Sequence, residues 1–320
     1  MPSPRLAIPL ALRALLALAP CAAPAAAQRG PDGVWQLDAR PGEYRLVQLT
    51  VRDDDDWRGG TTSFGVDPDS LPGLTADQLR PRYDGPAAFR FVRDAGTFVF
   101  EGRIAAGRGR GTYRFTPDAA YADALARRGY ARPSAEQQFA LALHGVGFPL
   151  LDELRAQRYD RPDVDALVTM GMHGVQADYV RRLGALGYRL RTADALVELR
   201  DHGVTPRFLE GLAALGYRDL APDEARELRD HGVTPEYVQG LAAVGYRGLS
   251  ARELLEARDH GVTRGYVDGF RQLGYARTSM AEMIRLRDHG VSAAFAERMR
   301  RRLGRLPSVD ELVEARDRGL

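Results

Sequence analysis

A tripeptide, His-Gly-Val, recurs every 29 residues in this 320-residue chain, and it limits the possible folds more than any other feature. It occurs at 144–146, 173–175, 202–204, 231–233, 260–262 and 289–291. Its histidines are His144, His173, His202, His231, His260 and His289, and the sequence has no others. Similar segments that follow one another at a fixed period of about 20 to 50 residues indicate stacked structural units. We therefore predict that every copy folds in the same way.

Each unit carries the signals of two short helices, as residues 205–233 illustrate. Thr205 suits the N-cap of the first helix, and Pro206 suits its first turn, where a missing N–H costs little. Gly216 and Gly232 follow the two helices, and glycine readily adopts the left-handed conformation that ends a helix. A Ser-x-x-Gln or Ser-x-x-Glu capping box marks the second helix in four copies. The boxes are Ser134 with Gln137, Ser250 with Glu253, Ser279 with Glu282, and Ser308 with Glu311.

Helix pairs this short cannot bury their apolar stripes alone, whereas stacked pairs share one continuous core. A large apolar residue near the start of the first helix keeps the 29-residue spacing. It is Tyr121, Leu150, Tyr179, Phe208, Tyr237, Tyr266 or Phe295 in successive units. We predict that residues 116–320 form an α-solenoid of about six and a half two-helix repeats.

Residues 28–115 have a different pattern, and we predict a small antiparallel β domain there, which makes the whole chain α+β. Apolar and polar residues alternate, and Asp-Ala-Gly at 94–96 is typical of a short hairpin loop. Strands are predicted at 46–52, 89–91, 97–101 and 111–115, with loops at 53–61 and 67–86. Since no proline- or serine-rich linker follows, the helices should begin against the sheet, with the Tyr121 helix as their cap.

The first 27 residues have the features of a secretory signal peptide. Arg5 and Arg13 precede a short apolar run, and Ala-Ala-Ala at 25–27 offers a small-residue cleavage site. The run is much shorter than the ~20 residues that span a bilayer, so a membrane anchor is not predicted. We expect a periplasmic or extracellular mature protein without stable membrane insertion. Lipid attachment at Cys21 stays open.

Cysteine and charge content exclude several function classes. Cys21 is the only cysteine, so its removal with the signal would leave no disulfide, thiolate metal site or cysteine nucleophile. The 45 basic and 43 acidic residues would balance after the loss of Arg5 and Arg13. A neutral protein is a poor nucleic-acid binder by default. No nucleic-acid partner and no cofactor are therefore predicted, and the oligomeric state stays open.

The histidines could bind metal, act as general bases or cap helices. One metal ion needs several imidazoles close together, whereas equivalent positions of stacked helices lie about 10 Å apart. Each histidine precedes a stop glycine, where an imidazole favours the helix dipole and can donate to free carbonyl groups. We predict structural caps, no metal site and no catalytic residue, and hence no enzyme. Arg318 replaces histidine in the last unit, as expected if the histidine normally also contacts the next unit.

Several motifs have both a structural and a functional interpretation. The acidic run 53–56 before Trp57 lacks EF-hand spacing, so we predict a solvated loop. Gly-Arg-Gly-Arg-Gly at 107–111 lacks the Gly-Lys-Ser/Thr ending of a phosphate-binding loop, and we predict a flexible turn. For the arginines between 298 and 305 we favour a solvated last helix over an anion site.

Glycines recur inside the first helix of three successive units, at Gly211, Gly240 and Gly269. Each costs about 1 kcal/mol relative to alanine in a helix interior. Close helix packing would offset this cost, and that is the favoured interpretation. The alternative is a smooth groove for the backbone of a partner, so we place the candidate binding surface on these middle units.

The segment Leu-Arg-Asp-His-Gly-Val-Thr-Pro at 199–206, with Gly-Tyr about a dozen residues later, resembles a repeat of uncharacterised exported bacterial proteins. It is also similar to the repeat tails of some beta-lactam-sensor-type membrane zinc proteases. The resemblance covers 116–320 and carries over no catalytic residue, because the protease zinc motif is absent from this sequence. It implies an extracytoplasmic bacterial setting and a sensing or scaffolding role.

We therefore expect a non-catalytic binding or scaffold protein, secreted or of the cell envelope, that recognises a protein or peptide through its helical repeats. Exposed first-helix residues Arg207, Glu236 and Asp268 are the predicted partner contacts. The alternative is a sensor of a small ligand or polysaccharide, with its site in the β domain around Trp35, Trp57 and the acidic loop.

Overall fold

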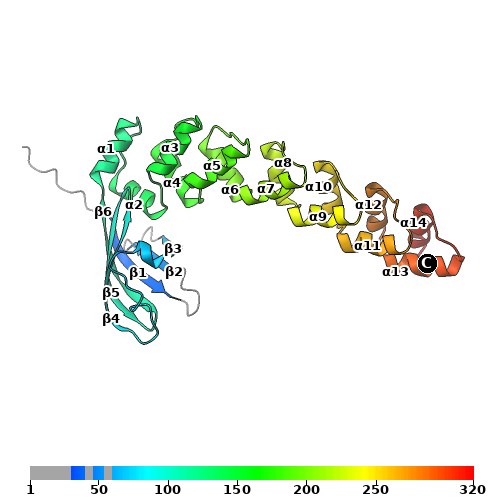
Figure 1. The fold of residues 1–320 in the computed structure, drawn as a ribbon, viewed down its shortest axis with the longest axis horizontal. Helices are drawn as coiled ribbons and strands as arrows, with labels where there is room; N and C mark the ends of the chain where they lie inside the picture. Colours follow the sequence, from blue (N-terminus) through cyan, green and yellow to red (C-terminus); the bar gives the residue numbers. More distant parts are fainter. Residues whose placement is uncertain (1–29, 40–45, 54–59) are drawn as a thin grey trace, which may run out of the picture.

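The computed structural model describes residues 30–39, 46–53 and 60–320. These residues form an α+β structure in which a six-stranded antiparallel sheet is followed by fourteen α-helices. The fourteen helices, residues 119–317, form an extended row that leads away from the sheet, and the last helix lies at the end farthest from the sheet (Figure 1). The predicted signal peptide with Cys21, most of the acidic run, and Trp57 lie outside the described residues.

The sheet is built from two three-stranded meanders that meet at its centre. The strands are β1 (Asp32–Asp38), β2 (Val47–Asp53), β3 (Thr61–Val66), β4 (Asp84–Arg93), β5 (Gly96–Ala105) and β6 (Arg108–Pro117), and a short 3-10 helix, η1 (Pro68–Ser70), follows β3. The strand order is β3-β2-β1-β6-β5-β4, and Trp35 of β1 pairs with Gly111 of β6. Neither β1 nor β3 was predicted from the sequence, and the loop predicted at 67–86 overlaps the start of β4.

Trp35 fills the centre of the sheet core and is 1% exposed. A Cβ on Gly109 would lie 2.6 Å from the Trp35 ring, and a Cβ on Gly111 would lie 2.7 Å from Nε1. The indole N–H donates to the carbonyl oxygen of Glu101 at 3.1 Å. The glycines therefore provide the room that the indole needs.

The prediction of a flexible turn at 107–111 is wrong for most of its length. Only Ala106 and Gly107 form the turn, with φ of 50° and 78°, and the chain from Arg108 onward is strand β6. The alternation of glycine and arginine is a strand pattern, because successive residues of a strand point to opposite faces. Glycine faces the indole and arginine faces solvent.

The sheet is so strongly curved that its two edge strands, β3 and β4, face one another across the core. Phe64 of β3 and Phe91 of β4 stack with ring centroids 5.6 Å apart, although these strands stand at opposite ends of the strand order. Leu49, Phe98 and Phe100 lie within the enclosed core with no exposed surface. The curvature thus leaves the outer face of the sheet to polar side chains.

Each sequence unit contributes two helices to the row. The helices are α1 (Ala119–Arg127), α2 (Ala135–Leu143), α3 (Phe148–Ala156), α4 (Val164–Met172), α5 (Ala177–Ala185), α6 (Ala193–Asp201), α7 (Pro206–Ala214), α8 (Pro222–Asp230), α9 (Pro235–Ala243), α10 (Ala251–Asp259), α11 (Arg264–Gln272), α12 (Met280–Asp288), α13 (Ala293–Leu303) and α14 (Val309–Asp317). Odd-numbered helices are the first helices of the units, and even-numbered helices are the second. From α3 to α13 each first helix contacts the next first helix.

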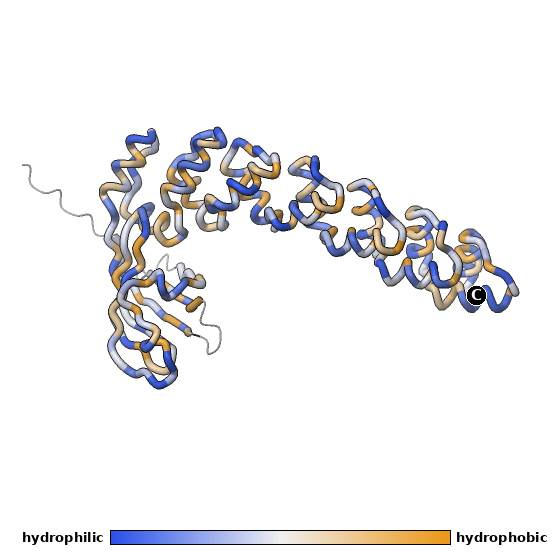
Figure 2. Tube along the Cα trace, viewed as in Figure 1, coloured by the Kyte–Doolittle hydropathy of each residue, from blue (hydrophilic) through white to orange (hydrophobic). Residues whose placement is uncertain are grey.

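Every helix turns an apolar face into the row. Leu212 of α7, Leu228 of α8 and Leu241 of α9 have no exposed surface. Hydrophobic and hydrophilic residues alternate along the helices (Figure 2), as expected for helices that are buried on one side. The core between the helices therefore continues from unit to unit.

The helix boundaries follow the capping signals of the sequence. Thr205 is the N-cap of α7, with Pro206 in its first turn. Gly216 and Gly232 have φ of 104° and 72°, and the Tyr217 N–H donates back to the Leu212 carbonyl at 3.1 Å. All four predicted serine capping boxes are confirmed, at the starts of α2, α10, α12 and α14.

The row begins against the sheet through α2, whereas the prediction gave this place to the Tyr121 helix, α1. Phe139 of α2 packs its ring on Phe98, Tyr113 and Phe115 at centroid distances of 5.4, 6.1 and 5.4 Å. Asp94, in the β4–β5 turn, accepts a 2.7 Å hydrogen bond from the backbone N–H of Phe148 at the start of α3. The sheet thus supplies both an apolar surface and a helix cap to the row.

Candidate functional site

The histidines lie at the junctions between successive units. Each occupies the C-cap of a second helix, from His144 after α2 to His289 after α12. In five of them Nδ1 is hydrogen-bonded to an aspartate at the end of the next second helix, rather than to the free carbonyls expected from the sequence. The pairs are His173–Asp201 (2.6 Å), His202–Asp230 (2.8 Å), His231–Asp259 (2.6 Å), His260–Asp288 (2.6 Å) and His289–Asp317 (2.8 Å).

Two of the histidines, His144 and His231, have pKa values shifted in opposite directions by their surroundings. The hydrogen bond to Asp259 raises the pKa of His231. His144 has Met172 where the others have an aspartate, and burial lowers its pKa. The first junction therefore lacks the His–Asp hydrogen bond of the later ones. The sequence held a usable signal for these pairs, since an aspartate directly precedes each of the last four histidines and also Arg318, which replaces histidine in the last unit.

An arginine two positions before the histidine, or before Arg318 in the last unit, packs on the aromatic residue of its own unit. The pairs are Arg200–Tyr179, Arg229–Phe208, Arg258–Tyr237, Arg287–Tyr266 and Arg316–Phe295, with guanidinium carbons 5.1 to 5.6 Å from the ring centroids. Arg229 also donates to the carbonyl of Gly203, the stop glycine of the preceding unit, at 3.1 Å. Cation–π contacts of this kind contribute about 0.5–1 kcal/mol at exposed sites.

Tyrosine hydroxyls donate hydrogen bonds to backbone carbonyls at both edges of the row. Tyr179 donates to the Val204 carbonyl at 3.0 Å, and Tyr237 donates to the Val262 carbonyl at 2.8 Å. At the other edge, Tyr217 donates to the Leu249 carbonyl at 2.6 Å. Burial raises the pKa of Tyr237 to about 12, so its hydroxyl stays protonated and able to donate. The junctions are thus specified by polar contacts as well as by apolar packing.

Gly211, Gly240 and Gly269 face the next first helix. A Cβ on Gly211 would lie 2.6 Å from Pro235 Cγ, and a Cβ on Gly269 would lie 2.9 Å from the Ala293 Cβ. At Gly240 the nearest atom, Cβ of Arg264, is 3.5 Å away. Close helix approach therefore explains two of the three glycines, and the groove interpretation is not needed for them.

The predicted contact residues Arg207, Glu236 and Asp268 do not form one equivalent set. Arg207 and Glu236 stand one repeat apart, both exposed, at the second positions of α7 and α9. Asp268 lies deeper in α11, is half-buried, and accepts from Gln272 at 2.9 Å. The description of Asp268 as exposed is therefore wrong. The exposed series is instead Asp178, Arg207 and Glu236, in which the sign of the charge alternates from unit to unit.

The arginines near the C-terminus are largely engaged within their own segment. Arg300 and Arg301 pair with Glu297 at 3.3 and 3.0 Å, and Arg305 pairs with Glu311. Arg298 packs over the Phe295 ring at 5.5 Å. These contacts favour a solvated, self-paired helix end.

Trp35, which was predicted to lie at a ligand site of the β domain, is buried and cannot contact a ligand there. Within 30–39, 46–53 and 60–320, no three histidine, aspartate or glutamate side chains are close enough to bind a metal ion. None of the helices in these ranges is long and apolar enough to cross a bilayer.

Comparison with protein-family models, curated proteins and solved structures finds no match to this chain.

Proposed function

We propose that this protein is a non-catalytic binding or scaffold protein, secreted or of the bacterial cell envelope, whose residues 116–320 form an α-solenoid that recognises a protein or peptide. One observation carries the proposal. The same His–Asp, Arg–aromatic and Tyr–carbonyl contacts recur from unit to unit, so equivalent exposed side chains appear at regular intervals. An extended partner can bind several such positions at once.

The first-helix face of the middle units is the proposed binding surface. Asp178, Arg207 and Glu236 occupy the same position of α5, α7 and α9, and their charges alternate. The pKa of Glu236 is lowered, because its carboxylate accepts from its own backbone N–H and from Thr234, so it is ionised at neutral pH. A peptide with alternating charge would match this order, and mismatched charges would select against other peptides.

A site-specific photo-cross-linker tests this surface in the full chain. The reactive side chain is placed at Arg207 or Glu236, and matched positions are Arg110 on the outer face of the sheet and Glu314 on α14. We expect one reproducible adduct with the same protein from 207 and 236, and none from 314. Equal labelling at all positions, or none at any of them, contradicts the proposal.

A second candidate function is a small-ligand or polysaccharide sensor. It is favoured by a groove of about 780 Å³ on the outer face of the sheet, lined by polar side chains that include Gln36, Asp38, Thr50 and Arg110. This groove replaces the surroundings of Trp35 as the site to test. Cross-linking from Arg110 alone would favour the sensor over the binding surface of the helices.

A further inference from the structure

A second surface groove lies where the row begins, between the end of α1, the middle of α3 and the loop that leads to α4. Its volume is about 560 Å³, within the range typical of small-molecule sites. Four arginines line it, Arg127, Arg128, Arg155 and Arg161, against a single acidic residue, Asp160. The groove is therefore strongly positive, although the whole chain is nearly neutral.

Neighbouring groups fix two of the four guanidinium groups in place. Arg128 pairs with Asp152 at 3.3 Å and lies 4.8 Å from the Phe148 ring. Arg161 donates to the Gly129 carbonyl at 3.1 Å and lies 5.8 Å from the Tyr130 ring. Side chains held in this way lose less conformational freedom when a ligand binds.

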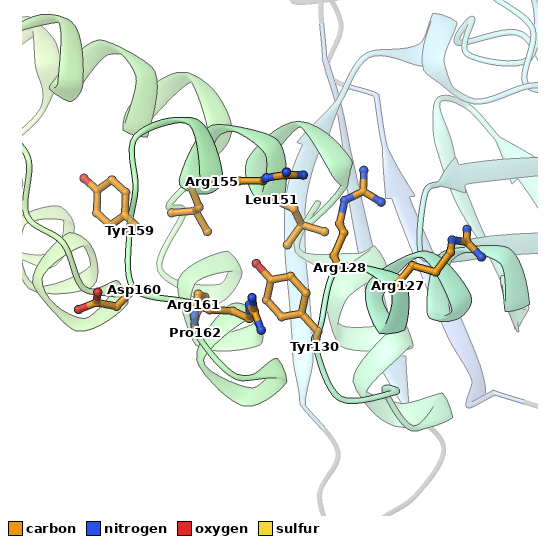
Figure 3. A pocket seen from close by; sticks show the side chains of 10 residues that line it. Arg127, Arg128, Tyr130, Leu151, Arg155, Tyr159, Asp160, Arg161 and Pro162 are labelled. Atoms are coloured by element: carbon orange, nitrogen blue, oxygen red, sulfur yellow. The ribbon is translucent and has the colours of Figure 1, made fainter.

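Arg155 has no ion pair or hydrogen bond from its side chain to any residue in the described part of the chain. Its side chain extends toward Arg128, while Tyr130 lies between Arg128 and Arg161 (Figure 3). Arg127 leads away from the other three and lies at the rim (Figure 3). Because Arg155 has no carboxylate partner, its guanidinium group repels that of Arg128, and an anion between them relieves this repulsion.

The later units provide an internal comparison for this groove. Two repeats further on, the lining of the equivalent groove between α5 and α7 includes two arginines, Arg189 and Arg218, and one aspartate, Asp219. The positions that correspond to Arg127, Arg128, Arg155 and Arg161 are Ala185, Leu186, Ala213 and Asp219. The fold thus forms the same junction without these arginines.

Helix ends do not account for the arginines. Cations favour the C-terminal ends of helices, and Arg127, Arg128 and Arg155 lie near the ends of α1 and α3. The equivalent helix ends of α5 and α7 finish without arginine at these positions. The larger excess of arginine is therefore an added property of the first junction.

We propose that this groove binds a phosphate-type dianion, with Arg128, Arg155 and Arg161 as the binding residues and Tyr130 beside them. The planar fork of a guanidinium matches two oxygens of a phosphate group. The four arginines of the groove, less the charges of Asp160 and of Asp152, leave two positive charges to balance a dianion. The volume of the groove exceeds that of inorganic phosphate, so the ligand is a phosphate monoester that carries a small polar group. The site is separate from the first-helix face of the middle units, and its failure would leave the cross-linking result at Arg207 unchanged.

Calorimetric titration of the full chain tests the site, with glucose 6-phosphate as the soluble probe and glucose as the uncharged control. Vesicles that contain phosphatidic acid, compared with phosphatidylcholine vesicles, test a lipid source of the same group. We expect saturable binding of one phosphate source and none of its control. Arg155→Gln should weaken binding by at least about tenfold.

Arg189→Gln is the matched variant, because it removes one arginine from the equivalent groove between α5 and α7. We expect it to leave the affinity within about twofold of the unmodified chain. An unchanged melting temperature in both variants shows that the fold is intact, since exposed substitutions shift stability little. No saturable binding to either phosphate source, or an equal loss in both variants, overturns the proposal.

Discussion

At the scale of residues, the repeated motif divides its contacts among neighbouring positions. In the copy at 200–204, the arginine packs on the aromatic ring of its own unit, the aspartate accepts from the histidine of the preceding unit, and the histidine pairs with the following unit. The glycine then ends the helix, and the valine carbonyl accepts a tyrosine hydroxyl. A single substitution in this segment therefore acts on one identifiable contact.

Substitution of a stop glycine should be more damaging than substitution of the histidine beside it. Gly232 has φ of 72°, and a non-glycine residue in the left-handed region costs about 1–2 kcal/mol, more when it is β-branched. His231 is exposed and contributes one screened contact. We expect Gly232→Val to lower the free energy of unfolding more than His231→Ala in urea titrations. The opposite order would make the histidine, rather than the glycine, the main determinant of the junction.

Two histidines should respond to pH in opposite directions. The raised pKa of His231 means that its bond to Asp259 stabilises the fold fully below about pH 6.5, and that this contribution is lost as the pH rises through the raised value. The lowered pKa of His144 means that protonation below about pH 6.5 opposes its burial, so stability is lost as the pH falls.

Urea titrations at pH 5.5 and pH 8 separate these effects. His231→Gln should destabilise the protein more at the lower pH than at the higher pH. His144→Gln should be relatively more favourable at the lower pH. The same pH dependence in both variants would contradict the assignment.

At the scale of elements, the spacing between first helices depends on the residues at the contact between them. Gly211 faces the ring of Pro235, whereas Gly240 faces the flexible side chain of Arg264. These glycines occupy the same position in adjacent units, so they differ only in the neighbour. The distances predict opposite effects of the same substitution.

Gly240→Ala should stabilise the protein by about 0.5–1 kcal/mol, since alanine favours the helix and its Cβ meets Arg264 at an ordinary contact distance of 3.5 Å. Gly211→Ala should destabilise it by about 1 kcal/mol or more, because a Cβ 2.6 Å from Pro235 Cγ forces the helices apart. Thermal melts of the two variants measure both effects. A gain in both would show that helix contact does not require glycine at 211.

At the scale of the whole molecule, the sheet and the row are joined at one end only. Phe139 of α2 contacts the sheet, and Asp94 of the sheet caps α3. From there, helix contacts pass between neighbouring units. A disturbance at the sheet should therefore weaken with distance along the row.

Phe139→Ala should remove about 2 kcal/mol or more of packing at this junction. We expect faster amide hydrogen exchange in β5, β6, α1 and α2, with α11–α13 unchanged, as mass spectrometry of the labelled chain would measure. Leu312→Ala in α14 is the matched control and should act at the opposite end. Equal acceleration along the whole chain would show that the sheet and the helices unfold as one unit.

Much of the local structure followed from the sequence by itself. The spacing of glycines, serine capping boxes and Pro206 located the helix boundaries, because helix ends depend on backbone conformation and on side chains a few residues away. The chain was therefore predicted as α+β with helices after a sheet. In the sheet, β1 and β3 were missed, although β1 alternates Gly33, Trp35 and Leu37 toward the core.

Only the tertiary structure decided which side chains meet across units. The sequence placed Asp201 and His173 in separate copies of a motif, and stacking brings them to 2.6 Å. The same holds for the inward face of Gly109 and Gly111, which depends on the position of Trp35 in another strand. It also holds for the positive groove at the first junction, where arginines from α1 and the loop after α3 converge. These contacts join residues far apart in the chain, and the packing of helices and strands fixes their distances, whereas local sequence fixes only the conformation of each element.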